Sequence, residues 1–211
     1  MNADEFLRHY DRVADAQEAV TRLRRFVLDL AVRGKLVPQD DTDDPASNLL
    51  ASIAAERAHL GVGSAAVPVG VDEMPFPLPS GWSWSRIGEV CSKTGSGSTP
   101  RGGQAAYKHA GIPFLRSQNV YDDGLRLEDV AFIDADTHAR MAGTQVRPKD
   151  LLLNITGGSI GRCCRVPDDF GEANVSQHVA ILRLAVPAMS DYLHRLGKVC
   201  ATCLYSTQVR T

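Results

Sequence analysis

The sequence contains no apolar run that approaches the roughly 20 residues needed to cross a bilayer. Its first residues, MNADEFLRHYDRV, are acidic and amphipathic, and they lack the basic segment and apolar core of a secretory signal. These absences argue against a membrane span and an export signal, so we expect a cytoplasmic protein. The formal net charge is −2, which excludes a strongly basic surface over the whole chain.

Cysteine is scarce, and its five copies form no disulfide pattern. Cys163 and Cys164 are adjacent on a predicted strand, so their side chains should face opposite sides of the sheet. The sequence CATC at residues 200–203 is a single CxxC pair, whereas a structural zinc site needs four ligands. We therefore expect reduced thiols and no metal site.

No segment carries a complete catalytic or nucleotide-binding motif. The glycine-rich residues 93–103 (KTGSGSTPRGG) lack the Gly-Lys-Ser/Thr ending of a phosphate-binding loop. The sequence NITG at residues 154–157 differs from the Asn-Pro-Pro-aromatic motif of amino-methyltransferases. We therefore expect a protein that is not an enzyme by itself. The glycine-rich segment is either a surface loop or a backbone that closely approaches another group, such as a DNA phosphate.

The first 60 residues predict two helices. Residues 3–33 carry an apolar seam with alternating gaps of three and four, which is typical of helices that pair. Gly34 stands where a glycine often ends a helix, and a shorter helix should run from Pro45 to about His59. The pattern leaves open whether the seam packs on its own domain, on another helix or on another chain. Its residues are Val13, Ala16, Val20, Leu23, Val27 and Leu30.

Composition changes after this region. Residues 61–79 are rich in glycine and proline and contain no Lys or Arg, which predicts a linker. Residues 1–60 hold 8 Lys+Arg and 11 Asp+Glu, whereas residues 80–211 hold 15 and 12. The second domain is therefore mildly basic, as expected if it contacts phosphates.

Short apolar runs in residues 80–211 end in polar loops. Trp82 and Trp84 should alternate on a first strand, and further strands are expected at residues 112–120, 130–133, 150–156, 161–166 and 173–184. Short strands with irregular loops predict an α+β fold. Three of the loops gather side chains that can bind base edges or phosphates. The candidate DNA contacts in and around them are Arg101, Lys108, Arg116, Gln118, Asn119, Thr156, Ser159, Arg162, Gln177 and His178.

Two blocks of the sequence resemble the specificity subunits of type I restriction–modification systems. The first is FVLDLAVRGKLVPQDDTDDPASNLLASIAAER, residues 26–57. The second begins LPSGWSWSRIGEVC and continues through GIPFLRSQNV, VRPKDLLLNITGGSIGRCC and NVSQHVAILRL. Together they extend to about residue 196. The resemblance implies that residues 1–60 are a helical region for helix pairing and partner docking. It also implies that residues 80–211 are one target recognition domain with an incomplete C-terminal end.

The resemblance further implies a non-catalytic subunit that recognises a sequence in double-stranded DNA. Methylation and restriction subunits of the same system would then methylate and cleave the DNA, so S-adenosylmethionine, ATP and magnesium are expected on those partners and not in this chain. Members of the family carry two target recognition domains, whereas one is found here. We therefore expect a chain truncated to the N-terminal half, or a half-subunit that forms a homodimer. The alternative is a truncated interaction protein that binds methylation subunits without reading DNA.

Overall fold

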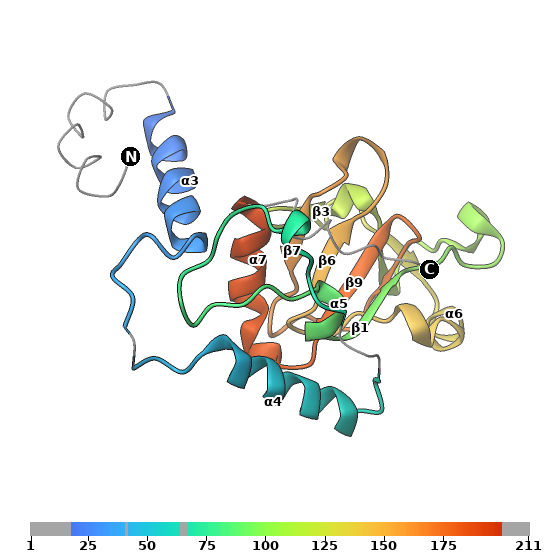
Figure 1. Ribbon diagram of the computed structural model, residues 1–211. Helices are drawn as coiled ribbons and strands as arrows, with labels where there is room; N and C mark the ends of the chain where they lie inside the picture. The colour runs from blue at the N-terminus through green and yellow to red at the C-terminus, as the bar shows by residue number, and fades with distance from the viewer. Residues whose placement is uncertain (1–17, 41, 64–66, 200–211) are drawn as a thin grey trace.

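The computed structural model describes residues 18–40, 42–63 and 67–199. These residues form an α+β fold of several helices and three small sheets, which confirms the predicted fold class (Figure 1). The helices are α3 (Ala19–Val32), α4 (Ala46–His59), α5 (Ile87–Val90), α6 (Ala135–Arg140) and α7 (Ser190–Val199). The strands are β1 (Cys91–Ser96), β2 (Ile112–Leu115), β3 (Val120–Tyr121), β4 (Gly124–Leu125), β5 (Ala131–Ile133), β6 (Leu151–Asn154), β7 (Cys163–Arg165), β8 (Asn174–Val175) and β9 (Val179–Leu184).

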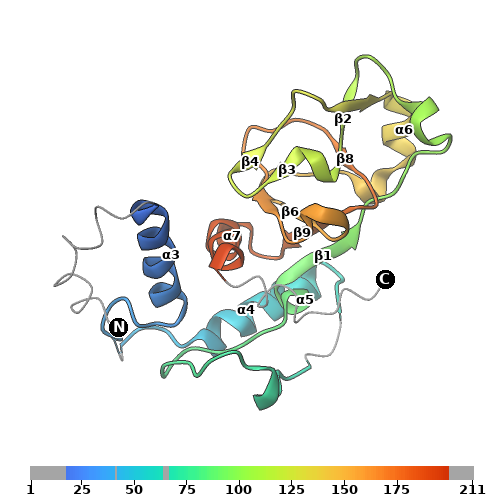
Figure 2. The same cartoon turned by 90° about the horizontal axis from the view of Figure 1, so that it is seen from above.

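A four-stranded antiparallel sheet with the order β1-β9-β6-β7 lies at the centre of the molecule. Helices α3, α4 and α7 lie on one side of this sheet, and the smaller sheets β5-β2-β8 and β3-β4 lie on the other (Figure 2). The helices cover one face of strands β6 and β9 and the smaller sheets cover the other, which matches their nearly continuous apolar sequences.

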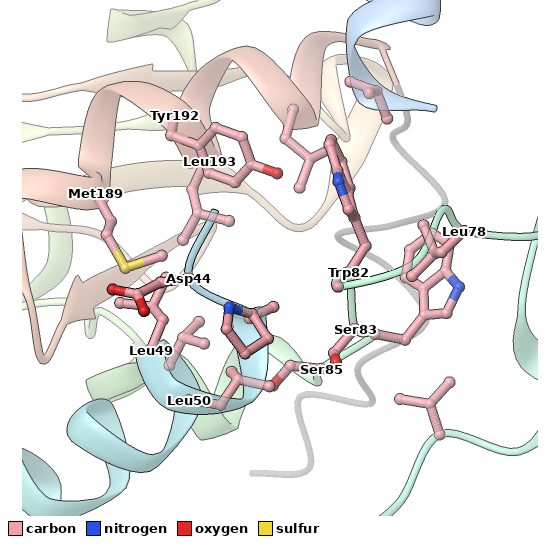
Figure 3. A pocket seen from close by; sticks show the side chains of 18 of the residues that line it. Asp44, Leu49, Leu50, Leu78, Trp82, Ser83, Ser85, Met189, Tyr192 and Leu193 are labelled. Carbon is pink, nitrogen blue, oxygen red and sulfur yellow. The ribbon is translucent and has the colours of Figure 1, made fainter. Parts of the chain in front are cut away.

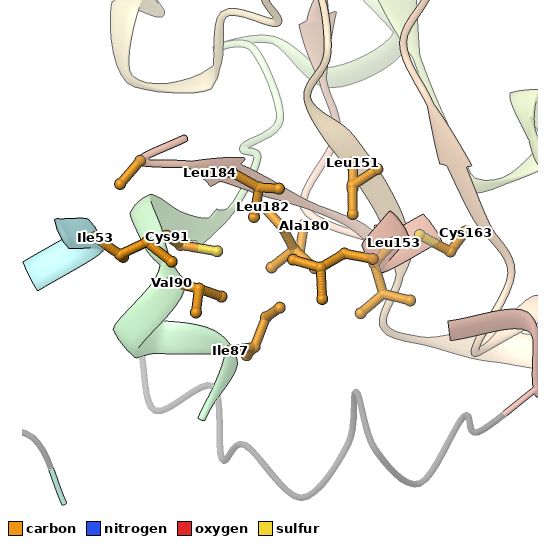
Figure 4. Packing of buried hydrophobic residues seen from close by; sticks show 12 residues of the cluster. Ile53, Ile87, Val90, Cys91, Leu151, Leu153, Cys163, Ala180, Leu182 and Leu184 are labelled. Atoms are coloured by element: carbon orange, nitrogen blue, oxygen red, sulfur yellow. The ribbon is translucent and has the colours of Figure 1, made fainter. Parts of the chain in front are cut away.

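Alternate residues of the central strands enter two separate cores. Leu151 and Leu153 face the helices and pack with Ile53 of α4 and with α5 and α7 (Figure 4). Leu152 and Ile181 face the smaller sheets. This period of two follows from the pleat of the strands, in which successive side chains point to opposite faces.

The two adjacent cysteines follow the same alternation. Cys163 belongs to the core on the helix side and Cys164 to the core on the other side, which confirms the prediction. Cys91 is also buried, and burial raises the pKa of its thiol to about 12. Because the thiolate is the reactive and metal-binding form, Cys91 is a packing residue.

Helix α3 ends at the predicted glycine. The Gly34 amide donates to the carbonyl of Ala31, and the Lys35 amide donates to the carbonyl of Leu30. Gly34 itself has a φ of 63°, as this C-terminal motif requires. A Cβ on Gly34 would lie 2.5 Å from Cγ of Pro79, so the end of α3 is pressed against the segment that enters the second domain.

The heptad seam is only partly covered. Val13 and Ala16 lie outside the described residues. Leu30 is buried and helix α3 contacts α7, but Val20 is 62% exposed and Val27 is 37% exposed. The C-terminal end of the helix therefore packs on its own chain, whereas pairing of Val20 and Val27 with another helix or another chain stays a prediction.

Replacing Gly34 with alanine should destabilise the fold more than the same change at Gly61. Both glycines end helices with the same pair of hydrogen bonds and have similar φ angles, 63° and 71°. Nothing lies within 4 Å of a Cβ on Gly61, so only the left-handed backbone should cost stability there, about 1–2 kcal/mol. Overpacking against Pro79 should add roughly 1–3 kcal/mol at Gly34. Chemical denaturation of the two variants measures the difference, and equal losses would contradict the close packing.

Several local predictions were wrong. Residues 82–84 form no strand, although Trp82 and Trp84 are both partly buried as aromatic packing residues. The first part of the glycine-rich segment belongs to β1 and is not a loop. The strand expected at 173–184 is divided into β8 and β9 by a turn at residues 176–178. Where a strand begins and ends depends on which distant strands offer backbone hydrogen-bond partners, and the local sequence does not contain this information.

Helix α4 packs directly into the second domain. Ile53 is 1% exposed within the core on the helix side, and the Arg57 guanidinium donates to the Cys91 carbonyl over 3.0 Å. The following segment is attached as well, because Arg86 pairs with Glu73 at 2.8 Å. The boundaries at residues 60 and 80 stay predictions. Within the part of the chain that the structure describes, no helix is both long and apolar enough to span a membrane.

Candidate nucleic-acid interface

Three predicted polar loops meet at one end of the central sheet. Asn154, the last residue of β6, is fully buried and its amide nitrogen donates to the Ser117 carbonyl over 2.8 Å and to the Ser159 hydroxyl over 3.0 Å. The Ile155 amide donates to the carbonyl of His178 over 3.1 Å. The loops at residues 116–119, 154–162 and 176–178, far apart in sequence, are therefore joined by direct hydrogen bonds. We call them the three polar loops.

The loop after β1 joins the same surface through Gly97. The Gly97 amide donates to the carbonyl of Val179 over 2.9 Å, and the Thr99 hydroxyl donates to the amide oxygen of the Gln177 side chain. A Cβ on Gly97 would lie 2.6 Å from the carbonyl oxygen of Ser176 and closer still to that of Val175. The close approach that this glycine permits is thus to a neighbouring loop of the same chain.

Four of the candidate side chains are exposed on this surface: Gln118, Thr156, Gln177 and His178. The Thr156 hydroxyl and the His178 Nδ1 atom are 2.6 Å apart, and the Gln177 Nε2 and His178 Nε2 atoms are 3.2 Å apart. The Thr156 hydroxyl and the Gln177 amide have further hydrogen-bonding capacity, whereas both ring nitrogens of His178 are already engaged and would have to exchange a partner to bind a ligand. Internal contacts therefore orient a row of polar groups that still reach solvent.

Two residues of this surface, Tyr121 and Arg126, were not among the contacts predicted from the sequence. The Arg162 guanidinium lies 4.6 Å from the centre of the Tyr121 ring, and that of Arg126 lies 5.3 Å from it. The hairpin of β3 and β4 that carries Tyr121 is held by the Asp122 carboxylate, which accepts a hydrogen bond from the Cys163 amide at 3.0 Å. The turn sequence YDDG is visible at residues 121–124, but its position beside Arg162 depends on long-range packing.

One predicted contact is corrected. Asn119 is 2% exposed, its amide oxygen accepts from the Arg116 backbone amide, and its amide nitrogen donates to the Arg126 carbonyl. Asn119 therefore holds the loop together from inside and does not face a ligand in this conformation. The Arg116 guanidinium is partly exposed and donates to the carbonyl of Asp129 over 2.9 Å, and its contact with DNA stays a prediction.

Two predicted basic contacts, Arg101 and Lys108, lie outside the three polar loops. Arg101 is exposed on the loop that follows β1. The backbone of Lys108 forms an isolated β-bridge with Phe132 of β5, and its ammonium group lies 3.6 Å from the Asp134 carboxylate. Hydrogen bonds from Thr137, the largest cause, together with the Lys108 charge, lower the pKa of Asp134. Lys108 therefore faces an ionised partner at neutral pH, with which a phosphate would compete.

In the part of the chain that the structure describes, no three His, Cys, Asp or Glu side chains lie close enough to hold a metal ion. The CxxC pair at residues 200–203 lies outside the described residues.

A second feature is a cleft of about 830 Å³ on the helix side of the molecule. Tyr192 and Leu193 of α7 face Trp82 across it, while Leu49 and Leu50 of α4 line its base (Figure 3). This cleft is lined mainly by apolar and aromatic side chains, in contrast to the polar surface of the three loops.

Comparisons with known proteins agree with the resemblance in the sequence. No protein-family model matches the chain. The chain is 30% identical over 154 residues to the Type I restriction enzyme EcoAI specificity subunit of Escherichia coli, a match that covers 70% of this chain and 26% of the relative. It is 38% identical over 99 residues to the Type I restriction enzyme EcoEI specificity subunit of Escherichia coli, covering 44% and 16%. The chain thus spans about a quarter or less of each relative.

Solved structures of similar proteins match more distantly. The HsdS subunit from Thermoanaerobacter tengcongensis is 19% identical, with a TM-score of 0.47 over 99% of this chain and 44% of that chain. A chain from a structure of the type I R-M system is 18% identical, with a TM-score of 0.46 over 86% and 40%. The assignment therefore rests on the two sequence relatives, whose matched length is well beyond a single motif. By that similarity, the chain belongs to the family of type I restriction enzyme specificity subunits.

Proposed function

We propose that this chain reads a specific base sequence in double-stranded DNA and directs partner subunits, which methylate and cleave DNA, to that sequence. The observation that carries the proposal is the meeting of the three polar loops, whose exposed amide, hydroxyl and imidazole groups can bind base edges. The membership in a family of specificity subunits supports the same function. In this proposal the chain is the non-catalytic member of a larger complex.

The geometry favours selective reading over general adhesion to DNA. The net charge of −2 offers no broad basic surface, and non-selective binding depends mainly on such charge. Asn154 and Asn119 fix the backbone of the loops from within, so the exposed groups are held in place before DNA arrives. A site that is ordered in advance loses less conformational entropy on binding.

The partners proposed are a methylation subunit and a restriction subunit of the same system. S-adenosylmethionine, ATP and magnesium would bind to those subunits. Helix α3 supports docking of the methylation subunit, because Val20 and Val27 of its seam are exposed apolar side chains on one face. The alternative, a truncated chain that binds methylation subunits without reading DNA, uses the helical region of residues 1–60 for docking.

Alanine at Gln118 should relax sequence preference, whereas alanine at Lys108 should weaken binding to all sequences. Gln118 can make paired hydrogen bonds to adenine, which contribute about 1–3 kcal/mol of discrimination. Lys108 would contact a phosphate, so its loss should lower the salt dependence of binding by about one ion. Fluorescence anisotropy with the preferred duplex and its single-base variants measures both effects.

Gln104→Ala is the matched control, because Gln104 is an exposed glutamine outside the three polar loops. It should change neither preference nor affinity. If Gln118→Ala lowers affinity equally for every sequence, Gln118 is not a readout residue.

Aspartate at both Val20 and Val27 should weaken binding of the methylation subunit at least about tenfold, since a charge would enter the apolar contact. Thr21→Asp is the control, because Thr21 is exposed on the same helix outside the seam. Deleting residues 1–60 is unsuitable, since Ile53 belongs to the core. Surface plasmon resonance gives the affinities, and an unchanged affinity in the double variant would exclude α3 as the docking helix.

A further inference from the structure

The contact between Tyr121 and Arg162 links two parts of the surface that the sequence separates by 41 positions. The hairpin of β3 and β4 contacts β7, whose first residue follows Arg162, and this places the ring beside the guanidinium. At 4.6 Å from the ring centre, Arg162 is the nearer of the two arginines that flank Tyr121. Both Tyr121 and Arg162 are partly exposed. A planar guanidinium held over a ring keeps its N–H edge available to a ligand.

The backbone of Arg162 is fixed on both sides. Its amide donates to the Ser159 carbonyl over 3.1 Å, and its carbonyl accepts from the Asn154 amide over 2.9 Å. The side chain therefore starts from a defined position, and the Tyr121 ring limits the directions that it can take. Contact with the ring reduces the rotamer freedom that Arg162 would otherwise lose on binding.

The guanidinium N–H groups of Arg162 also differ from those of Arg116 and Arg126 in their hydrogen-bond partners. Arg126 pairs with the Asp123 carboxylate at 2.7 Å, and Arg116 donates to the Asp129 carbonyl. Among the residues that the structure describes, Arg162 makes no ion pair and no side-chain hydrogen bond, and its guanidinium lies over the Tyr121 ring. Its paired donors are thus the ones ready for a ligand with two neighbouring acceptors.

We propose that Arg162 reads a guanine in the DNA target and that Tyr121 is the positioning residue that aims it. Guanine presents two acceptors, O6 and N7, in the major groove, and the forked donors of arginine match them. The inference rests on the proposed function. It adds one recognised base, guanine, and one residue outside the three polar loops, Tyr121. The Arg126 guanidinium, 5.3 Å from the centre of the same ring, is held by the Asp123 carboxylate.

The test uses the purified full chain and a duplex of the sequence that it selects. Each guanine of this duplex is replaced in turn by 7-deazaguanine, which lacks the N7 acceptor. In the wild-type protein, replacement at one position should lower affinity about 5- to 100-fold, because the hydrogen bond from the charged guanidinium to N7 is lost while O6 remains. In Arg162→Met and Tyr121→Leu, affinity for the unmodified duplex should fall by a similar factor, and the effect of that replacement should drop below about threefold.

Tyr121→Phe is the matched control, because it keeps the ring and removes only the hydroxyl. It should keep the wild-type sensitivity to 7-deazaguanine. Retention of that sensitivity in a folded Tyr121→Leu protein would overturn the role of Tyr121. If Tyr121→Leu does not fold, Arg162→Met decides, because methionine keeps the chain length and removes the donors: unchanged sensitivity overturns the inference. A protein that selects a sequence but is insensitive at every guanine also overturns it, whereas a protein that selects no sequence contradicts the proposed function itself.

Discussion

Replacing Gly97 with alanine should abolish sequence-selective DNA binding and lower the free energy of unfolding by about 1–3 kcal/mol. The added Cβ would meet the carbonyl oxygens of Val175 and Ser176, which belong to the backbone and cannot rotate away. Either the loop after β1 or the turn at residues 176–178 must move. That turn carries Gln177 and His178, and it is joined to the loop of Thr156. A displacement there should misplace several proposed contacts together.

The matched control for Gly97→Ala is Gly95→Ala. Gly95 is two residues earlier on β1, and nothing lies within 4 Å of a Cβ added to it. Alanine there should leave DNA binding unchanged and should not lower stability, because glycine in a strand is itself unfavourable. Binding assays and chemical denaturation of both variants give the comparison. Wild-type selectivity in Gly97→Ala would show that the contact between the two loops does not organise the surface.

Removing the Arg183 guanidinium should destabilise the fold by about 3–5 kcal/mol, the loss expected when one partner of a buried ion pair is removed. Arg183 forms two bonds of 2.8 Å with the Asp150 carboxylate and a third of 3.0 Å with the Gln145 carbonyl. Asp150 is 1% exposed and also accepts a hydrogen bond from the Arg147 amide. Arg183→Ala would leave this carboxylate buried without its cation.

Two controls separate the buried charge from a general effect of losing arginine. Arg126→Ala breaks the exposed pair with Asp123 and should cost less than about 1 kcal/mol of stability. The double variant Asp150→Leu with Arg183→Met removes both charges and should be more stable than Arg183→Ala alone. Urea denaturation measures all three. A double variant as unstable as the single one would mean that the pair is needed for its shape and not for charge compensation.

The extent to which sequence predicts this molecule differs between its core and its surface. The apolar runs of β6 and β9, the opposite faces of Cys163 and Cys164 and the end of α3 at Gly34 follow from local rules of pleat and backbone conformation. Each of these features depends on residues close together in the chain. They were predicted correctly for that reason.

The surface depends on contacts between distant segments. Gln118 and Asn119 are adjacent and chemically alike, yet only Gln118 faces solvent, because the turn directs Asn119 to the Arg126 carbonyl. The pairing of Tyr121 with Arg162 and the close approach at Gly97 also require the folded sheets. A list of polar residues at strand ends can therefore locate a surface without saying which side chains face outward.

Selection from a random duplex library by the purified chain, alone and with a methylation subunit, determines whether the three polar loops read a DNA sequence. We expect enrichment of a defined motif, carried by one half-site or repeated with two-fold symmetry if two copies bind together. Gln118→Ala should weaken that enrichment at one position. Binding that falls steeply with salt and enriches no sequence, with or without the subunit, would show that the loops do not read sequence and would leave partner docking as the function of the chain.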